Sequence, residues 1–321
     1  MKKIFTIIMI TAILAGAVAA NAGTETTDQK LRFLMSNAYF TAPYCAAYQP
    51  SLESKARDLG VEVRILDAAG NQQTALQHAT TAIAEGYDGF IYFSADVDGA
   101  MPIIDELNNS GISWIGVNSL DGSRLEEMNI SYFHGPDSKS HGYTMAQFLL
   151  ETFPDGANLV AIEGTAGHNQ TININNAFSE TLNSSYVFMD KQDCNFQPEL
   201  AMAKMTDMLT AYGVASKGGR IDCIVSHDGG MLTGIISALE AEGLVPGDVK
   251  IVACGSNLVV KNALESGWLS ATSTQDPVTE GAEAMQLIYD IVTKPDSVPN
   301  GWYKLETPMA SPETINQFNW F

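Results

Sequence analysis

Polar and aromatic side chains gather at the end of the first apolar run of the sequence, in FLMSNAYFTAPYCAAYQP (Phe33 to Pro50). Rings, hydroxyls and amides of this kind can bind a small polyhydroxylated molecule, because rings stack on C–H faces and polar groups satisfy hydroxyls. Three rings are candidates for ligand contact: Tyr39, Phe40 and Tyr44. The alternative is that they are core rings beneath the helix that follows.

Catalytic chemistry finds little support in the residue pattern. There is no G-x-S-x-G motif and no carboxylate pair with an obvious division into acid and base. Cys45 and His227 could meet as nucleophile and base, but no third group that would orient them is evident. His134 and His141 lie seven residues apart without a third metal ligand. We therefore expect no enzyme activity, no metal and no cofactor.

The elements that must position the candidate residues follow a repeated strand–helix order. Apolar and β-branched runs alternate with helical patterns in two successive halves of the chain, which predicts an α/β fold with two doubly wound parallel-sheet lobes. The predicted strands are 31–36, 61–67, 89–94 and 112–119 in the first half, and 158–164, 186–190, 221–227 and 250–256 in the second.

The loops after these strands are the expected ligand-binding region, since ligands in such sheets lie outside the carboxyl ends of the strands. Amides, hydroxyls and a few rings dominate there, and no Lys or Arg occurs in any of the loops. The strand-end positions are 36–45, Asp67, 94–98 and 118–119 in the first half, and 164–171, 193–196, 227–228 and 255–257 in the second.

The chain begins with two lysines, an apolar core and small residues ending in Ala20-Asn21-Ala22. This is the layout of a secretory signal peptide, and its core is too short to span a bilayer. We expect a signal peptide over residues 1–22, cleavage near Ala22–Gly23, a periplasmic product and no direct membrane insertion.

Charge and cysteine content narrow the partners further. The formal net charge is −20, and it becomes −22 once Lys2 and Lys3 are removed, which disfavours nucleic acid as a partner. The remaining 299 residues exceed what one core usually organises, so two lobes are expected. Buried thiols are the favoured interpretation of the four cysteines, with one disulfide left open: Cys45, Cys194, Cys223 and Cys254.

A family resemblance extends over almost all of the mature chain. The chain carries, in order, MSN, FTAPY, GVNS, EGTAGHN, DCNF, SHDGGMLTGIISAL, VACGSN, SATSTQDP and ETPMASPETINQF. In these motifs and their spacing it resembles the ribose-type sugar-binding proteins of bacterial ABC importers, the type I periplasmic binding proteins. The resemblance implies a three-segment hinge between a first lobe (23–136 plus 276–303) and a second lobe (137–275 plus 304–321).

The resemblance also implies a set of ligand-binding positions. Tyr44 falls on the family's Pro-aromatic-aromatic turn, Phe196 matches the aromatic residue of the second lobe, and Gln275 matches the hinge glutamine. Asn118 and Ser119 take the place of an Asp-Arg pair, so both charges are missing. A strand-end Asn118 is otherwise a turn residue or cap.

Other positions depart from the family pattern. Asp228 stands where Asn is usual, and it could equally cap the helix that begins near Gly229. The expected Arg aligns with Ile172, which leaves Asn173, Asn175 or His168 as the replacement donor, although a loop histidine is more often solvent-facing. Tyr39 or Phe40, in a longer loop, would replace an amide that reads a hydroxyl.

The implied function is that of a periplasmic solute-binding protein. We expect a monomer that captures a small neutral sugar or polyol and delivers it to an ABC permease in the inner membrane. Neutral ligands are favoured over sugar acids because the matched positions hold no cation to compensate a buried anion. The alternative is a receptor for an autoinducer or a sugar that signals to a membrane histidine kinase or chemoreceptor.

Overall fold

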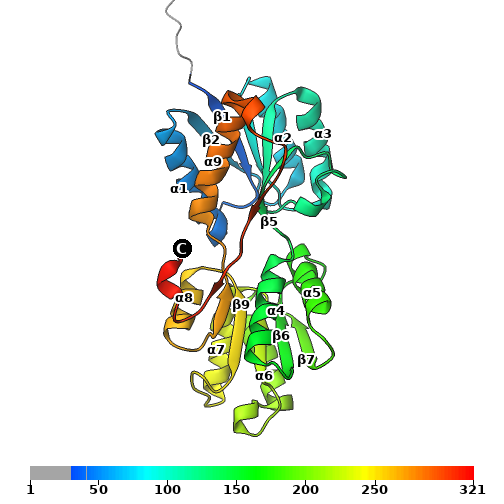
Figure 1. Ribbon diagram of the computed structural model, residues 1–321, viewed down its shortest axis with the longest axis vertical. Helices are drawn as coiled ribbons and strands as arrows, with labels where there is room; N and C mark the ends of the chain where they lie inside the picture. The colour runs from blue at the N-terminus through cyan, green and yellow to red at the C-terminus, as the bar shows by residue number, and fades with distance from the viewer. Residues whose placement is uncertain (1–29, 41) are drawn as a thin grey trace, which may run out of the picture. The chain divides into compact units, whose positions relative to one another are not determined.

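The structure, a computed structural model, describes residues 30–40 and 42–321 (Figure 1). The predicted signal peptide, 1–22, lies outside the described residues. Two α/β lobes, each built on a six-stranded sheet, account for the described chain, which confirms the predicted fold class. None of the helices in residues 30–40 and 42–321 combines the length and the apolar character needed to cross a membrane.

The first sheet has the strand order β11-β5-β4-β3-β1-β2, and all its pairings are parallel. Every residue of the GFIYF strand is buried, as expected for a strand covered on both faces. The strands are β1 (Arg32–Asn37), β2 (Glu62–Asp67), β3 (Gly89–Phe93), β4 (Ser113–Val117), β5 (Tyr132–Pro136) and β11 (Gly301–Leu305).

Helices cover both faces of the first sheet and complete the first lobe (Figure 1). One face packs against α1 (Pro43–Asp58) and α9 (Pro277–Thr293), and the other against α2 (Gln72–Ala84) and α3 (Met101–Ser110). The Asp276 carboxylate caps α9 by accepting from the backbone N–H groups of Val278 and Thr279, at 3.0 and 3.2 Å. This cap determines where α9 begins.

The second sheet has the order β12-β10-β9-β8-β6-β7, and β12 alone runs antiparallel to its neighbour among the described strands. The chain therefore repeats the first architecture with a different last strand. The strands are β6 (Ala157–Glu163), β7 (Tyr186–Asp193), β8 (Cys223–Ser226), β9 (Lys250–Cys254), β10 (Ala271–Ser273) and β12 (Met309–Ala310).

The second lobe is completed by helices on both faces of this sheet. One face packs against α4 (Ser140–Thr152) and α5 (Asn169–Thr181). The other packs against α6 (Pro198–Tyr212), α7 (Leu232–Ala241) and α8 (Leu258–Glu265). Short 3-10 turns occur at Asp98–Ala100, Gly122–Arg124, Ala215–Lys217, Gly229–Met231, Pro295–Ser297 and Ile315–Gln317.

Three short segments connect elements of one lobe to elements of the other: 137–139, 274–276 and 306–308. The first follows β5, the second precedes α9, and the third follows β11. The predicted lobe boundaries at 136, 275 and 303 stay a prediction, and β11 itself continues to Leu305, which pairs with Pro136.

Candidate ligand-binding site

Two adjoining cavities, together called the cleft below, lie at the ends of strands from both sheets. Their volumes are about 510 and 470 Å³, and they share four lining residues: Asn118, His141, Gln170 and Gln275. A monosaccharide or polyol is small enough for either cavity. We name the first the aromatic cavity, because four of its lining residues are Tyr44, Phe93, Phe196 and Phe321, and the second the amide cavity, lined by Asn118, Gln170, Asn173 and Gln275 among others.

Tyr44 is the central ring of the aromatic cavity. It lies in the first turn of α1, which begins with Pro43, a residue whose fixed φ suits a helix start. Its ring meets Phe93 at 6.1 Å between centroids with an interplanar angle of 76°, and Phe321 at 6.1 Å and 85°. Edge-to-face packing of this kind holds the Tyr44 ring in a defined orientation.

The hydroxyl of Tyr44 is bound by three side chains. It accepts from Asn118 Nδ2 at 2.8 Å and from Gln275 Nε2 at 3.1 Å, and it donates to Glu280 Oε2. The Gln275 Nε2 atom also donates to Glu280 Oε2 at 3.1 Å. Burial raises the pKa of Glu280 well above its ordinary value.

Phe196 contributes the ring of the second lobe. Its φ of 57° and the φ of 50° at Asn195 lie in the left-handed region, which is rare for a bulky residue and is often found at ligand sites. The ring lies against Gly164, where a Cβ would come within 2.1 Å of Phe196 Cζ. The His168 ring meets it edge-on at 5.1 Å.

Asn118 and Ser119 follow β4, and the backbone there turns sharply. Asn118 has a φ of 56°, which asparagine tolerates better than most residues, and its backbone N–H donates to the His134 carbonyl at 2.9 Å. The Ser119 hydroxyl donates to the Ser94 carbonyl. The turn brings the Asn118 amide to both cavities.

Gln275 is held by both lobes. Its backbone N–H donates to Ser256 Oγ at 3.0 Å, and its carbonyl accepts from the same hydroxyl at 2.5 Å. Its side-chain amide bonds Tyr44 and Glu280 of the first lobe. Gln275 therefore links the β9–α8 loop of the second lobe with the first lobe.

Asp228 supplies a carboxyl group from the second lobe. Its Oδ1 accepts from the backbone N–H of Gly230 at 2.7 Å, so it caps the 3-10 turn that follows, and it also lines the aromatic cavity. Burial raises the pKa of Asp228. The capping and ligand-facing roles considered for Asp228 are compatible in this geometry.

His141 and Gln170 line both cavities, and the sequence reasoning did not select them as ligand residues. His141 Nδ1 lies 2.8 Å from Ser273 Oγ, and burial lowers the pKa of His141 to about 4, so the ring is neutral at pH 7. Gln170 Nε2 donates to the His227 carbonyl at 2.8 Å. Both residues are polar and lie in the first turn of a helix that follows a strand, and this pattern could have indicated a ligand-facing position.

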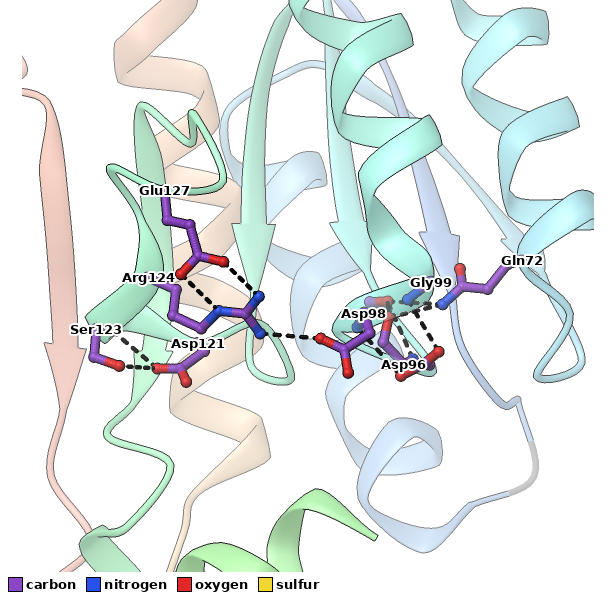
Figure 2. A network of polar contacts seen from close by, with 9 residues as sticks. Gln72, Asp96, Asp98, Gly99, Asp121, Ser123, Arg124 and Glu127 are labelled. Atoms are coloured by element: carbon purple, nitrogen blue, oxygen red, sulfur yellow. Dashed lines mark hydrogen bonds and ion pairs between the residues drawn. The ribbon is translucent and has the colours of Figure 1, made fainter. Parts of the chain in front are cut away.

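A network of polar contacts holds the rim of the amide cavity, and Figure 2 shows its members. Asp96, which lines this cavity, accepts from the backbone N–H of Gly99 at 3.0 Å, and its carbonyl accepts from Gln72 Nε2 at 2.9 Å (Figure 2). Arg124 joins Asp98 and Glu127 through ion pairs of 3.1 and 2.7 Å. These contacts stabilise the loop after β3 from both sides.

The lining of the cleft is neutral or acidic. Neither cavity has a Lys or Arg among its lining residues, and three carboxylates line them: Asp96, Asp137 and Asp228. Within residues 30–40 and 42–321, no group of three or more His, Cys, Asp or Glu side chains could hold a metal ion. The electrostatics therefore suit a neutral or cationic molecule.

The Cys45–His227 pair has no activated nucleophile. Burial raises the pKa of the Cys45 thiol to about 11. His227 is fully buried 6.5 Å from the Phe178 ring, and neither of its ring nitrogens has a hydrogen-bond partner in the described part of the chain. All four cysteines are buried and free.

Eight of the ten predicted binding residues line the cleft: Tyr44, Asn118, Ser119, His168, Asn173, Phe196, Asp228 and Gln275. Tyr39 and Phe40 do not. Tyr39 is 46% exposed and its ring lies over Gly70, while the Phe40 backbone N–H donates to Asp67 Oδ1 at 3.3 Å. The contacts with the β2–α2 loop direct this part of the chain away from both cavities.

The fold and the cleft define a class of protein: two α/β lobes that present rings and amides to one small molecule at the ends of their strands. The chain belongs to the periplasmic binding protein domain family, whose model matches residues 33–296. It is 22% identical over 271 residues to the ribose import binding protein of Bacillus subtilis (strain 168), covering 83% of each chain. It is also 22% identical over 281 residues to the xylitol-binding protein of Mycolicibacterium smegmatis, covering 87% of this chain and 77% of that one.

Solved structures show the same fold. A solute-binding protein of an ABC transporter from Bacillus halodurans, solved with bound myo-inositol, matches with a TM-score of 0.77 at 20% identity, covering 91% of this chain and 98% of that one. A periplasmic ribose ABC transporter protein from Conexibacter woesei matches with a TM-score of 0.79 at 18% identity, covering 90% and 94%.

Proposed function

We propose that this protein is a periplasmic solute-binding protein that captures a small neutral sugar or polyol and delivers it to an ABC permease. The observation that carries the proposal is the cleft itself, which combines Tyr44 and Phe196 from two lobes with the amides of Asn118 and Gln275 and no cationic side chain. Rings can cover the C–H faces of such a ligand while the amides satisfy its hydroxyls.

The similar proteins support this assignment. The family is one of solute-binding proteins, and the two curated relatives are named for ribose import and xylitol binding. The proposal includes a signal peptide over 1–22, a monomeric product, the lobe boundaries given by the sequence, and no catalytic turnover of the bound molecule.

Binding would favour a closed arrangement of the lobes. The segments 137–139, 274–276 and 306–308 are the connections about which the lobes would move. A ligand shifts such an equilibrium only if it binds the closed form better, which requires contacts with both lobes at once. Residues from both lobes line the aromatic cavity, so one small molecule can meet this requirement.

A thermal-shift screen of the exported protein tests the proposal. The compounds are D-ribose, D-xylose, D-allose, xylitol and myo-inositol, with D-galacturonate as the anionic comparison. We expect at least one neutral compound to raise the melting temperature, since a ligand at 100 times its Kd stabilises the folded state by about 2.7 kcal/mol. Stabilisation by galacturonate, with every neutral compound inert, would contradict the proposal.

A further inference from the structure

Glu280 is a buried carboxyl group behind the wall of the aromatic cavity. It lies in the first turn of α9, is 4% exposed, and does not line either cavity of the cleft. Its Oε2 accepts from Tyr44 and Gln275, two residues that do line the cleft. Glu280 therefore acts on the cleft through its neighbours.

The hydrogen-bonding capacity of Tyr44 is used up by this arrangement. A phenolic hydroxyl has one proton to donate and two lone pairs to accept with. The proton goes to Glu280, and the lone pairs accept from Asn118 and Gln275. The ring of Tyr44 is thus free to contact a ligand, whereas its hydroxyl has no capacity left.

The same count determines how the Gln275 amide is turned. Its Nε2 donates toward both Tyr44 and Glu280, each at 3.1 Å, and because these two oxygens are hydrogen-bonded to each other they share one N–H. A flipped amide would place its carbonyl oxygen against two groups that are already accepting at that point. The carboxyl of Glu280 therefore directs Nε2 toward itself and leaves Oε1 as the group of Gln275 that can serve the cleft.

We propose that Glu280 is a positioning residue of the ligand site, which orients the Gln275 amide and the Tyr44 hydroxyl so that the cleft presents a carbonyl oxygen to a hydroxyl proton of the ligand. This inference rests on the proposed function and adds that Gln275 meets the ligand as a hydrogen-bond acceptor. Asn118 Oδ1 and the second carboxyl oxygen of Asp228, which also line the cleft, accept no hydrogen bond from the described residues and are further acceptors. A molecule with several hydroxyl donors, such as a polyol or a sugar, matches this set.

Variants at position 280 separate positioning from general packing. Glu280→Gln keeps a carbonyl oxygen that can accept from Tyr44 and Gln275, whereas Glu280→Leu keeps the size and removes the acceptor. The matched control is Glu283→Gln, one turn further along α9, with the same substitution on a side chain that is 52% exposed.

Calorimetry with D-ribose, xylitol and myo-inositol measures the effect on affinity. For whichever of these binds the wild type, we expect Kd to rise at least tenfold in Glu280→Leu and to stay within about threefold in Glu280→Gln and Glu283→Gln. An unchanged Kd in a folded Glu280→Leu protein, or a loss in Glu280→Gln as large as in Glu280→Leu, would overturn the proposal.

A second measurement needs no ligand and applies to the wild-type protein. Hydrogen exchange of the Gln275 side-chain amide, followed by nitrogen-resolved NMR, reports whether the Nε2 proton that faces Tyr44 and Glu280 is bonded. We expect slow exchange in the wild type, Glu280→Gln and Glu283→Gln, and rapid exchange in Glu280→Leu. Exchange at the rate of a free amide in the wild type would overturn the role of Glu280, whereas failure of every compound to bind, with slow exchange retained, would count against the proposed function alone.

Discussion

The hydroxyl of Tyr44 on α1 donates a hydrogen bond to the carboxyl of Glu280 on α9, although the two residues lie 236 positions apart in the sequence. The helices can approach this closely because Gly281 follows Glu280. A Cβ at Gly281 would lie 2.5 Å from the Tyr48 carbonyl oxygen. The missing side chain thus brings a buried carboxyl directly behind the ring that contacts the cleft.

Tyr44→Phe keeps this ring and removes its hydroxyl. Glu280 then loses a donor, and Asn118 and Gln275 lose an acceptor. We expect the free energy of unfolding to fall by about 1–3 kcal/mol, the usual cost of leaving buried polar groups unpaired. Urea denaturation at pH 7 measures it, and Tyr39→Phe, at a ring that is 46% exposed, should change it by less than about 0.5 kcal/mol. Equal losses in the two variants would contradict the prediction.

Glu280→Gln should change how stability depends on pH. Burial raises the pKa of Glu280 in the folded protein above its unfolded value of about 4.3. The contribution of protonated Glu280 to the free energy of unfolding is therefore complete below about pH 4.3 and is lost as pH rises through the folded pKa. Glutamine stays neutral throughout. We therefore expect the variant to gain stability relative to the wild type as pH rises above about 4.3.

The measurement is urea unfolding of the ligand-free protein at a series of pH values. The ionisable groups that act on Glu280 are Asp276 at the N-cap of α9, Glu283 on α9 and Tyr44 on α1. Each is retained in Glu280→Gln, so the difference from the wild type isolates Glu280. A difference that does not vary with pH would show the prediction to be wrong.

His227→Phe should protect the protein at low pH. Burial lowers the pKa of His227 to about 3, so its contribution to stability is present above the unfolded pKa of about 6.5 and is lost as pH falls below it. Phenylalanine does not titrate and matches the Phe178 environment. We expect the variant to become the more stable protein as pH falls from 6.5 to 4. Denaturant unfolding at each pH measures this. If the free energies of unfolding of the variant and the wild type changed in parallel with pH, the prediction would be wrong.

Gly164→Ala should disturb the ring of the second lobe. The new Cβ would lie 2.1 Å from Phe196 Cζ and 2.7 Å from Thr171 Oγ1, so the Phe196 ring has to move. We expect a loss of stability of about 1–3 kcal/mol, typical of overpacking, and weaker binding of whichever neutral compound binds the wild type. Gly243→Ala is the control. Its φ of 74° makes the substitution destabilising, but no atom lies within 4 Å of the added Cβ, so no side chain has to move. Calorimetry should show weaker binding in the first variant only.

The alternation of strands and helices was predictable because it depends on local patterns. Runs such as GFIYF in β3 and capping residues such as Asp276 at α9 carry their own signals over a few residues. The fold class followed from the order of these elements. The antiparallel pairing of β12 did not, since the two residues of this strand are too few to carry a periodic pattern.

The cleft was predictable where a residue follows a strand directly. Asn118 was selected in this way, Asp228 from the loop after its predicted strand, and Gln275 from the family pattern alone, and all three line the cleft. Glu280 was missed because it lies inside a helix, where a carboxyl group is ordinarily solvent-exposed. Tyr39 and Phe40 were placed in the site because of a longer loop, but the contacts of that loop with Gly70 and Asp67 direct them elsewhere.

The sequence by itself determined the two-lobe α/β architecture, the acidic character and the absence of Lys and Arg from the strand-end loops, because composition and periodicity are local properties of the chain. Only the tertiary structure decided which polar atoms remain free to meet a ligand. That outcome depends on hydrogen bonds between Tyr44, Gln275 and Glu280, residues brought together by the packing of α1 against α9. A donor or acceptor is available only after its partners are known, and partners so distant in sequence leave no local pattern.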